Sequence, residues 1–205
     1  MITLSPVAAT EQQTFRALLD CMALPGKVAS LDWVPRDDGP WAAAVACLQA
    51  LVDHEVDFAV LASDPRPQEL LLRRTGSRTV PVSQARYLLA DEANALDALR
   101  AASTGTIDYP EEGATVVVLC SRLEVGAGLP SAGKGRLGGA VLELSGPGIE
   151  STARLTVHGL PPGVFSLLAE RNRAFPLGID LVLASAEGAI ACVPRTAAVH
   201  DVARE

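Results

Sequence analysis

Short apolar runs alternate with helical segments in the first part of this chain, and this alternation restricts the possible folds more than any other feature. Runs of strand length with β-branched or apolar character occupy residues 56–62, 86–90 and 115–120. Between them, residues 65–74 and 91–100 carry the apolar spacing of helices. This order is typical of parallel strands that helices connect, and it predicts the α/β class.

The second part of the chain has a different pattern, because strands follow one another with little helix between them. Strand-like runs occupy residues 140–145 and 152–158, and one helical segment follows at 161–171. A β-hairpin is expected at residues 179–193. Together the two patterns imply a mixed sheet that helices cover on both faces. No linker is long enough to separate domains, so residues 1–205 are expected to form a single domain.

The first helix is expected to run from Thr10 to Cys21 or beyond. Thr10 and Gln13 have the spacing of a capping box, in which each side chain binds a free backbone N–H of the first turn. Pro25 and Gly26 would end the helix. Its apolar face would consist of Phe15, Leu18, Leu19 and Met22.

Composition limits the classes of partner. The 205 residues are 49% hydrophobic and 20% charged, which is too apolar for a disordered chain. The net charge of −7 is spread along the chain, whereas a nucleic-acid-binding protein would present a basic face, so no nucleic-acid partner is expected. The mean hydropathy of +0.26 is high, and burial of apolar surface against another subunit is its simplest explanation.

The sequence also predicts a cytoplasmic location and no membrane partner. No apolar run approaches the roughly 20 residues of a membrane-spanning helix, and the first residues lack the basic and long apolar regions of a signal peptide. The four cysteines have apolar neighbours and are expected to be packed, reduced thiols. They are Cys21, Cys47, Cys120 and Cys192.

A phosphate-binding motif and the two lysines could indicate a nucleotide or a cofactor, but each lacks a feature that such a site requires. Residues 128–134 match G-x-x-x-x-G-K, but Gly135 replaces the hydroxyl residue that binds Mg²⁺, and a strand rather than a helix follows. Residues 126–139 are therefore expected to be a glycine-rich loop. Lys27 follows a Pro-Gly turn and Lys134 lies among glycines, so neither suits a Schiff base with pyridoxal phosphate, and no cofactor is expected.

No residue is assigned a catalytic or metal-binding role. His54, His158 and His200 lack the spacing of metal ligands, and no cysteine lies near any of them in sequence. Nothing resembles the G-x-S-x-G turn that presents a nucleophilic serine.

Five residues are candidates for an anion-binding or cleft site. Ser103, Thr104 and Gly105 follow a helix and could present N–H and O–H donors, although they could equally form a plain helix end. Arg195 and Thr196 directly follow the last apolar run, and an arginine at a strand end often faces a cleft in α/β folds. Arg195 could equally hold the C-terminal segment in place.

Several segments, taken in order, resemble the PhnH family of the bacterial carbon–phosphorus lyase system. They are TFRALLDCMALPG at 14–26, STG at 103–105 with residues 110–115, LSGPGI at 144–149, FPLGIDL at 175–181 and PRT at 194–196. The ordered set spans nearly the whole chain, and FPLGIDL followed by PRT is its most specific part. Gly178 within FPLGIDL is expected to hold a backbone geometry that other residues avoid, or to permit close packing.

The resemblance implies a three-layer α/β/α sandwich similar to pyridoxal-phosphate-dependent transferases but without their cofactor. It also implies a homodimer that joins PhnG, PhnI and PhnJ in a complex that makes ribose 1-phosphonate 5-triphosphate from ATP and an alkylphosphonate. It supplies no catalytic residue for this chain. Three hypotheses follow: an accessory subunit without chemistry of its own, a phosphonate- or nucleotide-binding transferase subunit with its own anion site, and a degenerate pyridoxal enzyme.

Overall fold

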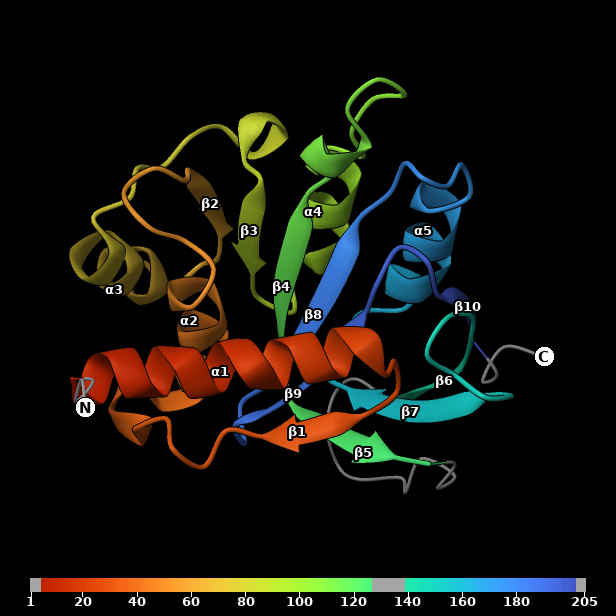
Figure 1. The fold of residues 1–205 in the computed structure, drawn as a ribbon, viewed down its shortest axis with the longest axis horizontal. Helices are drawn as coiled ribbons and strands as arrows, with labels where there is room; N and C mark the ends of the chain where they lie inside the picture. Colours follow the sequence, from red (N-terminus) through yellow and green to blue (C-terminus); the bar gives the residue numbers. More distant parts are fainter. Residues whose placement is uncertain (1–4, 127–138, 202–205) are drawn as a thin grey trace, which may run out of the picture.

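The fold consists of two sheets and five α-helices over the part of the chain that the computed structural model describes, residues 5–126 and 139–201 (Figure 1). The α-helices are α1 (Pro6–Ala23), α2 (Ala42–Gln49), α3 (Arg66–Thr75), α4 (Ala95–Ala101) and α5 (Val164–Arg171), and the short 3₁₀ helices are η1 (Arg36–Trp41), η2 (Val82–Gln84) and η3 (Pro110–Glu112). The strands are β1 (Val28–Ser30), β2 (Phe58–Leu61), β3 (Tyr87–Ala90), β4 (Thr115–Cys120), β5 (Arg122–Val125), β6 (Gly139–Ser145), β7 (Ala153–His158), β8 (Asp180–Ser185), β9 (Ala189–Val193) and β10 (Ala198–Asp201).

The larger sheet confirms the α/β class and the mixed sheet that the sequence predicts. Its six strands lie in the order β1-β9-β8-β4-β3-β2. Strands β2, β3, β4 and β8 run parallel, whereas β9 runs antiparallel to β8 and β1 antiparallel to β9. The central strand β4 is apolar along almost its whole length because both of its faces are buried.

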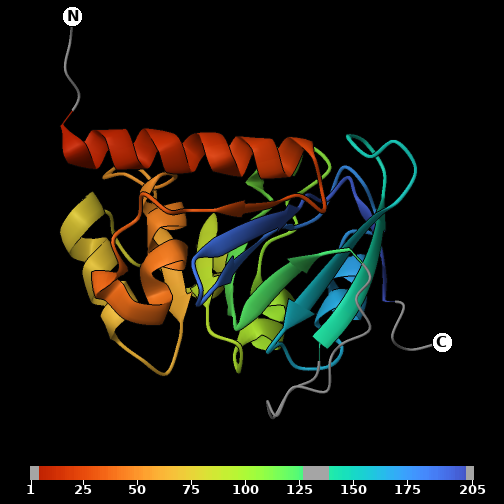
Figure 2. The same cartoon turned by 90° about the horizontal axis from the view of Figure 1, so that it is seen from below.

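Side chains that alternate along the central strands point into two separate cores. Val117 and Leu119 of β4 face α1 and α2, where they pack with Leu18 and Leu48. Val116 and Val118 point to the opposite face, where α4 and α5 pack. Helices therefore cover both faces of the six-stranded sheet (Figure 2).

A second sheet, which the sequence analysis did not predict, shares the face that α4 and α5 cover. It is antiparallel, with the order β10-β6-β7-β5. Its inward side chains, Leu142 and Leu144 of β6 and Leu155 and Val157 of β7, lie in the same core as α4 and α5. Strands β5 and β10 were not expected from the sequence.

The first helix begins earlier than predicted, and its proposed capping box is wrong. Ser5 is the N-cap, and the backbone N–H of Ala8 donates to its Oγ at 3.2 Å. Pro6 then fits the first helical position, where its missing N–H costs nothing. The hydroxyl of Thr14 donates to the carbonyl of Thr10 at 2.8 Å within the helix.

The predicted apolar face of this helix is also divided. Leu18 is buried against the sheet, together with Thr14 and Cys21. Phe15 and Leu19 instead point outward and are 41% and 52% exposed. The helix thus carries apolar side chains on its inner and its outer sides.

The helix expected over residues 91–100 begins at Ala95, because Asp91 caps the turn before it. The carboxylate of Asp91 accepts from the backbone N–H of Asn94 at 2.9 Å and from that of Ser63 at 2.9 Å. The bond from Ser63 connects the ends of β2 and β3. No helix within residues 5–126 and 139–201 is long and apolar enough to cross a membrane.

Candidate functional site

The loop between α4 and β4 holds three of the five candidate residues, Ser103, Thr104 and Gly105. The Oγ of Ser103 accepts from the backbone N–H of Gly105 at 3.1 Å, which turns the chain away from α4. Thr104 forms an antiparallel bridge with Gly113, so that residues 105–112 make a closed loop. Gly105 has a φ of +77° and lies against the carbonyls at the base of this loop, where a side chain would not fit.

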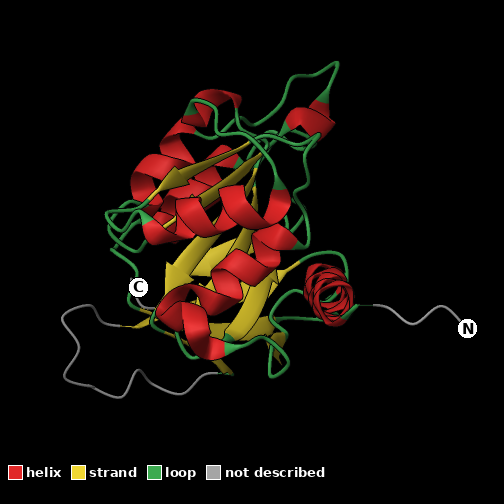
Figure 3. Cartoon of the chain, turned by 90° about the vertical axis from the view of Figure 1, so that its left-hand side faces the viewer, coloured by secondary structure: helices red, strands yellow, loops and turns green. Residues whose placement is uncertain are grey.

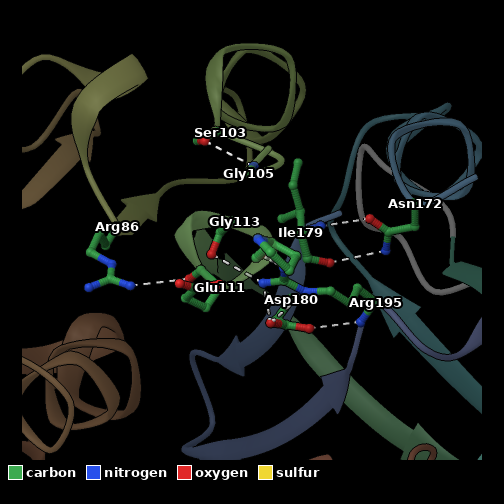
Figure 4. Close-up of polar contacts among 10 residues, drawn as sticks. Arg86, Ser103, Gly105, Glu111, Gly113, Asn172, Ile179, Asp180 and Arg195 are labelled. Atoms are coloured by element: carbon green, nitrogen blue, oxygen red, sulfur yellow. Dashed lines mark hydrogen bonds and ion pairs between the residues drawn. The ribbon is translucent and has the colours of Figure 1, made fainter. Parts of the chain in front are cut away.

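Arg195 reaches the base of the same loop from the end of β9 (Figure 4). Its guanidinium donates through Nη1 to the carbonyl of Pro110 at 2.8 Å and through Nη2 to the carbonyl of Gly113 at 3.1 Å. It also donates to the Asp180 carboxylate, from Nε at 3.1 Å and from Nη2 at 2.7 Å. The side chain is only 14% exposed, so these charge-assisted bonds form away from bulk water.

The segment before β8 closes the cluster from the other side. The backbone N–H of Gly178 donates to the carbonyl of Thr104 at 3.0 Å. Asn172 holds the same segment, since its Oδ1 accepts from the backbone N–H of Ile179 at 2.7 Å and its Nδ2 donates to the Ile179 carbonyl at 3.0 Å. Gly178 has a φ of +156°, and a Cβ there would lie 2.6 Å from the Asn172 Oδ1 and 3.0 Å from the Arg195 Cβ. The close packing expected at this glycine is therefore found.

The structure brings four of the five candidate residues together and places the fifth elsewhere. Ser103, Thr104 and Gly105 meet Arg195 around the loop base at Pro110–Gly113. Thr196 is exposed, and its carbonyl lies beside Gly146 in the turn between β6 and β7.

The position of Arg195 differs from the one that its sequence context suggested. Because β9 runs antiparallel to β8, Val193 lies opposite Leu181, near the amino end of β8. Arg195 therefore lies at the amino ends of the parallel strands, whereas the ligand crevice of open α/β sheets forms at their carboxyl ends. In this structure its guanidinium connects the loop base to β8, and an anion-binding role stays a prediction.

The outer side of α1 presents an exposed apolar surface, which we call the α1 patch and define by Phe15, Leu19 and Leu24. All three side chains are exposed, and Phe15 and Leu19 are neighbours at i, i+4 spacing. Figure 3 shows α1 end-on at the edge of the molecule, with its outer side away from the sheets. The spacing of Phe15 and Leu19 predicted one apolar face with Leu18 and Met22, because it fits a buried face and an exposed one equally well.

A cavity of about 520 Å³ lies between α1, η1 and α2. Its apolar lining includes Val34, Ala42 and Ala46. Two of its polar side chains already have carboxylate partners: Arg74 donates to the Asp38 carboxylate at 2.6 and 2.9 Å, and Gln49 donates to Glu11 at 2.8 Å. The cavity thus has the size of a ligand pocket, but its guanidinium and its amide are already occupied.

The cysteines are buried free thiols, as the sequence predicts. Burial raises the pKa of the Cys47 and Cys120 thiols well above its usual range. Cys21 donates to the carbonyl of Ile190 at 3.9 Å, and a hydrogen bond with Cys192 lowers the pKa of Cys21.

The remaining candidates for chemistry are dispersed. Lys27 is partly exposed and pairs with Asp20 at 3.0 Å. The Nε2 of His158 lies 3.7 Å from a carboxylate oxygen of Glu124. Among residues 5–126 and 139–201, no three His, Cys, Asp or Glu side chains gather as metal ligands would. Lys134, the motif at 128–134 and most of the loop expected at 126–139 lie outside the described residues.

Comparison with known proteins identifies the family. The family model described as bacterial phosphonate metabolism protein (PhnH) matches residues 4–200. HtxG of Stutzerimonas stutzeri, named as a C-P lyase subunit protein, is 35% identical over 197 residues, which cover 94% of this chain and 87% of HtxG. The PhnH subunit of alpha-D-ribose 1-methylphosphonate 5-triphosphate synthase from Rhizobium meliloti (strain 1021) is 30% identical over 189 residues, covering 90% and 88% of the two chains. The resemblance of the segments from TFRALLDCMALPG to PRT thus reflects homology, and this chain belongs to the PhnH family of phosphonate metabolism proteins.

Proposed function

We propose that this chain is an accessory subunit of the carbon–phosphorus lyase core complex. In this role it supports formation of ribose 1-phosphonate 5-triphosphate from ATP and an alkylphosphonate, in the cytoplasm, as a homodimer that joins PhnG, PhnI and PhnJ. The subunit names of its relatives support the assignment. The chain contributes binding surface rather than a reacting group.

The α1 patch is the observation that carries this proposal. Phe15 and Leu19 expose large apolar side chains side by side on a long helix that the core already holds rigidly on its other side. Contiguous exposed apolar surface of this kind is typical of protein interfaces, because its transfer out of water is favourable. A partner that covers α1 would remove this surface from water without any rearrangement of the fold.

Co-expression with PhnG, PhnI and PhnJ, followed by affinity purification on a tag of this chain, tests the proposal. The wild-type chain is expected to retain the other subunits, whereas Phe15→Glu and Leu19→Glu should release them because each buries a charge in the interface. Leu72→Glu, on the exposed side of α3, is the matched control and should behave as wild type. A stable monomer that binds none of the three subunits would contradict the proposal.

We further infer that the fold is a three-layer sandwich related to the pyridoxal-phosphate-dependent transferases, without their cofactor. The helices on both faces of the six-stranded mixed sheet support this relation. The ion pair of Lys27 with Asp20 at the molecular surface is unlike the ordered, desolvated wall that a Schiff base needs. Visible absorbance of a bound coenzyme after incubation with pyridoxal phosphate would contradict the inference.

A second candidate function, a phosphonate or nucleotide site on this chain, rests on the meeting of Ser103, Thr104, Gly105 and Arg195 at one loop base, with Thr196 nearby in sequence. Against it, the guanidinium already donates to Asp180, Pro110 and Gly113. Calorimetry of the purified chain with ATP and with methylphosphonate tests whether such a site exists. Absence of heat at millimolar ligand, with an unchanged melting temperature, would remove this function.

A further inference from the structure

The loop between α4 and β4 carries the most exposed large apolar side chain in the described part of the protein. We call residues 106–112, Thr-Ile-Asp-Tyr-Pro-Glu-Glu, the acidic loop. Ile107 is 77% exposed and Tyr109 is 57% exposed. The loop projects beyond the amino ends of the parallel strands, at the top of Figure 1, and so lies apart from the α1 patch.

The acidic loop is held firmly although its tip is in solvent. Thr106 and Tyr109 exchange two backbone hydrogen bonds of 3.2 Å, and the Thr106 hydroxyl accepts a further bond from the Tyr109 N–H at 3.1 Å. At the base, Arg195 donates to the Pro110 carbonyl and Gly178 donates to the Thr104 carbonyl. The backbone of the acidic loop would therefore lose little conformational freedom when a partner binds, and this reduces the entropic cost of association.

A second exposed aromatic residue lies in a neighbouring loop. Phe175 is in the loop between α5 and β8, which a hydrogen bond from Gly178 attaches to Thr104, just before the acidic loop. Both loops reach the same end of the molecule in Figure 1. Tyrosine and phenylalanine are enriched at protein interfaces, and tyrosine is among the residues that contribute most to binding energy there.

The charges around these side chains specify the partner. The carboxylates of Asp108, Glu111 and Glu112 are exposed, and within residues 5–126 and 139–201 none of them forms an ion pair. The nearby arginines are partly occupied, since Arg86 donates to the Glu111 carbonyl and Arg195 to the loop base. Three exposed carboxylates without an ion pair in the described residues would be repelled by nucleic-acid phosphates and by anionic lipid headgroups, but attracted by a basic protein surface.

We propose that the acidic loop is a docking element that inserts Ile107 and Tyr109 into an apolar socket rimmed by lysine or arginine side chains on another protein subunit. This rests on the proposed function, because it names a surface and a partner chemistry for the same assembly. The Arg195 cluster then acts as a positioning device, which fixes the loop in its binding conformation.

The test measures the affinity of the purified chain for a separately purified complex of PhnG, PhnI and PhnJ at low and high salt. Ile107→Ser and Tyr109→Ser should each weaken binding about 30-fold, as expected for central interface residues. Val125→Ser, an equally exposed apolar residue on β5, is the matched control and should leave affinity unchanged. Because these side chains are in solvent, the free energy of unfolding should stay near the wild-type value for all three variants.

Charge reversal tests the socket's basic rim. Glu112→Lys should weaken binding about 10-fold at low ionic strength, and the difference should shrink at high salt because solvent ions screen the attraction. Glu150→Lys, on the turn between β6 and β7, makes the same charge change elsewhere and should have little effect.

The outcomes separate the two proposals. If the wild-type chain binds the complex and the loop variants bind equally well, the docking role is wrong while the accessory-subunit function stands. If the wild-type chain binds none of the subunits, both the proposed function and the docking role are wrong. If the loop variants dissociate a homodimer instead, the socket belongs to a second copy of this chain and the proposed heterologous partner is wrong.

Discussion

The carboxylate of Asp180 accepts three hydrogen bonds from Arg195: one from the backbone N–H at 2.8 Å, one from Nε at 3.1 Å and one from Nη2 at 2.7 Å. Asp180 begins β8 and Arg195 follows β9, so this pair fastens the open end of the hairpin that the two strands form. The remaining guanidinium bonds extend the attachment to the loop before β4.

Arg195→Ala should lower the free energy of unfolding by about 2–4 kcal/mol, because it removes the guanidinium that pairs with a largely buried carboxylate and donates to two loop carbonyls, and leaves Asp180 only the backbone N–H at position 195. Urea denaturation followed by circular dichroism measures this. Arg100→Ala, which removes an exposed i, i+3 pair with Asp97, should cost less than about 0.5 kcal/mol. Equal effects of the two substitutions would show that the cluster contributes nothing beyond a surface ion pair.

Gly178→Val should destabilise the protein by about 2 kcal/mol more than Gly163→Val, because overpacking adds to the backbone cost. Both glycines have positive φ, +156° and +95°, so both substitutions strain the backbone. Only at Gly178 would a Cβ meet neighbouring atoms, whereas the space around Gly163 is open. A Gly178→Val variant that melts at the wild-type temperature would contradict the close packing of neighbouring atoms against Gly178.

Stability should decrease below pH 4 partly through Asp64. Hydrogen bonds from the Arg66 side chain and backbone, and from the Trp41 indole, lower the pKa of Asp64 from 3.8 to about 2. Because the folded pKa is below the unfolded one, this carboxylate stabilises the fold above about pH 4, and the contribution is lost as the pH falls towards 2. Asp64→Asn should therefore flatten the dependence of the urea midpoint between about pH 4 and pH 2. An unchanged slope would contradict this assignment.

Thiol labelling should distinguish the native from the unfolded protein sharply. All four cysteines are buried, and burial raises the pKa of Cys47 and Cys120, so little reactive thiolate is accessible. Ellman's reagent at pH 8 should release close to no thiolate from the native chain and four equivalents in concentrated urea. Fast reaction of Cys21, whose pKa is lowered by its hydrogen bond with Cys192, would reveal an opening between α1 and β9.

The sequence predicts the central parallel strands well because burial on both faces requires continuous apolar runs such as Thr115–Cys120. It does not reveal β5 and β10, which are short edge strands with polar residues such as Glu124 and His200. Local pattern was ambiguous for α1, where Phe15 and Leu19 fit a buried face and an exposed one equally well.

The candidate site was only partly predictable for a related reason. Arg195 and Gly113 are 82 positions apart, and only the antiparallel return of β9 brings them together. Once β9 is known to run opposite to β8, the residues that follow β9 must lie at the amino ends of the parallel strands. The exposure of Ile107 and Tyr109 has no local signature either, because it depends on how far the loop projects from the sheet.

The pairing of β1 with β9 has a consequence for how this protein is made. Val28 and Ser30 find their partners at Ala191 and Ala189, more than 150 residues later in the chain. Until the β8–β9 hairpin has been synthesised, β1 has no strand to pair with, although the inner side of α1 can already pack against α2. The six-stranded sheet is therefore completed late in folding, because the β1–β9 pairing joins segments far apart in sequence and such non-local pairing forms slowly.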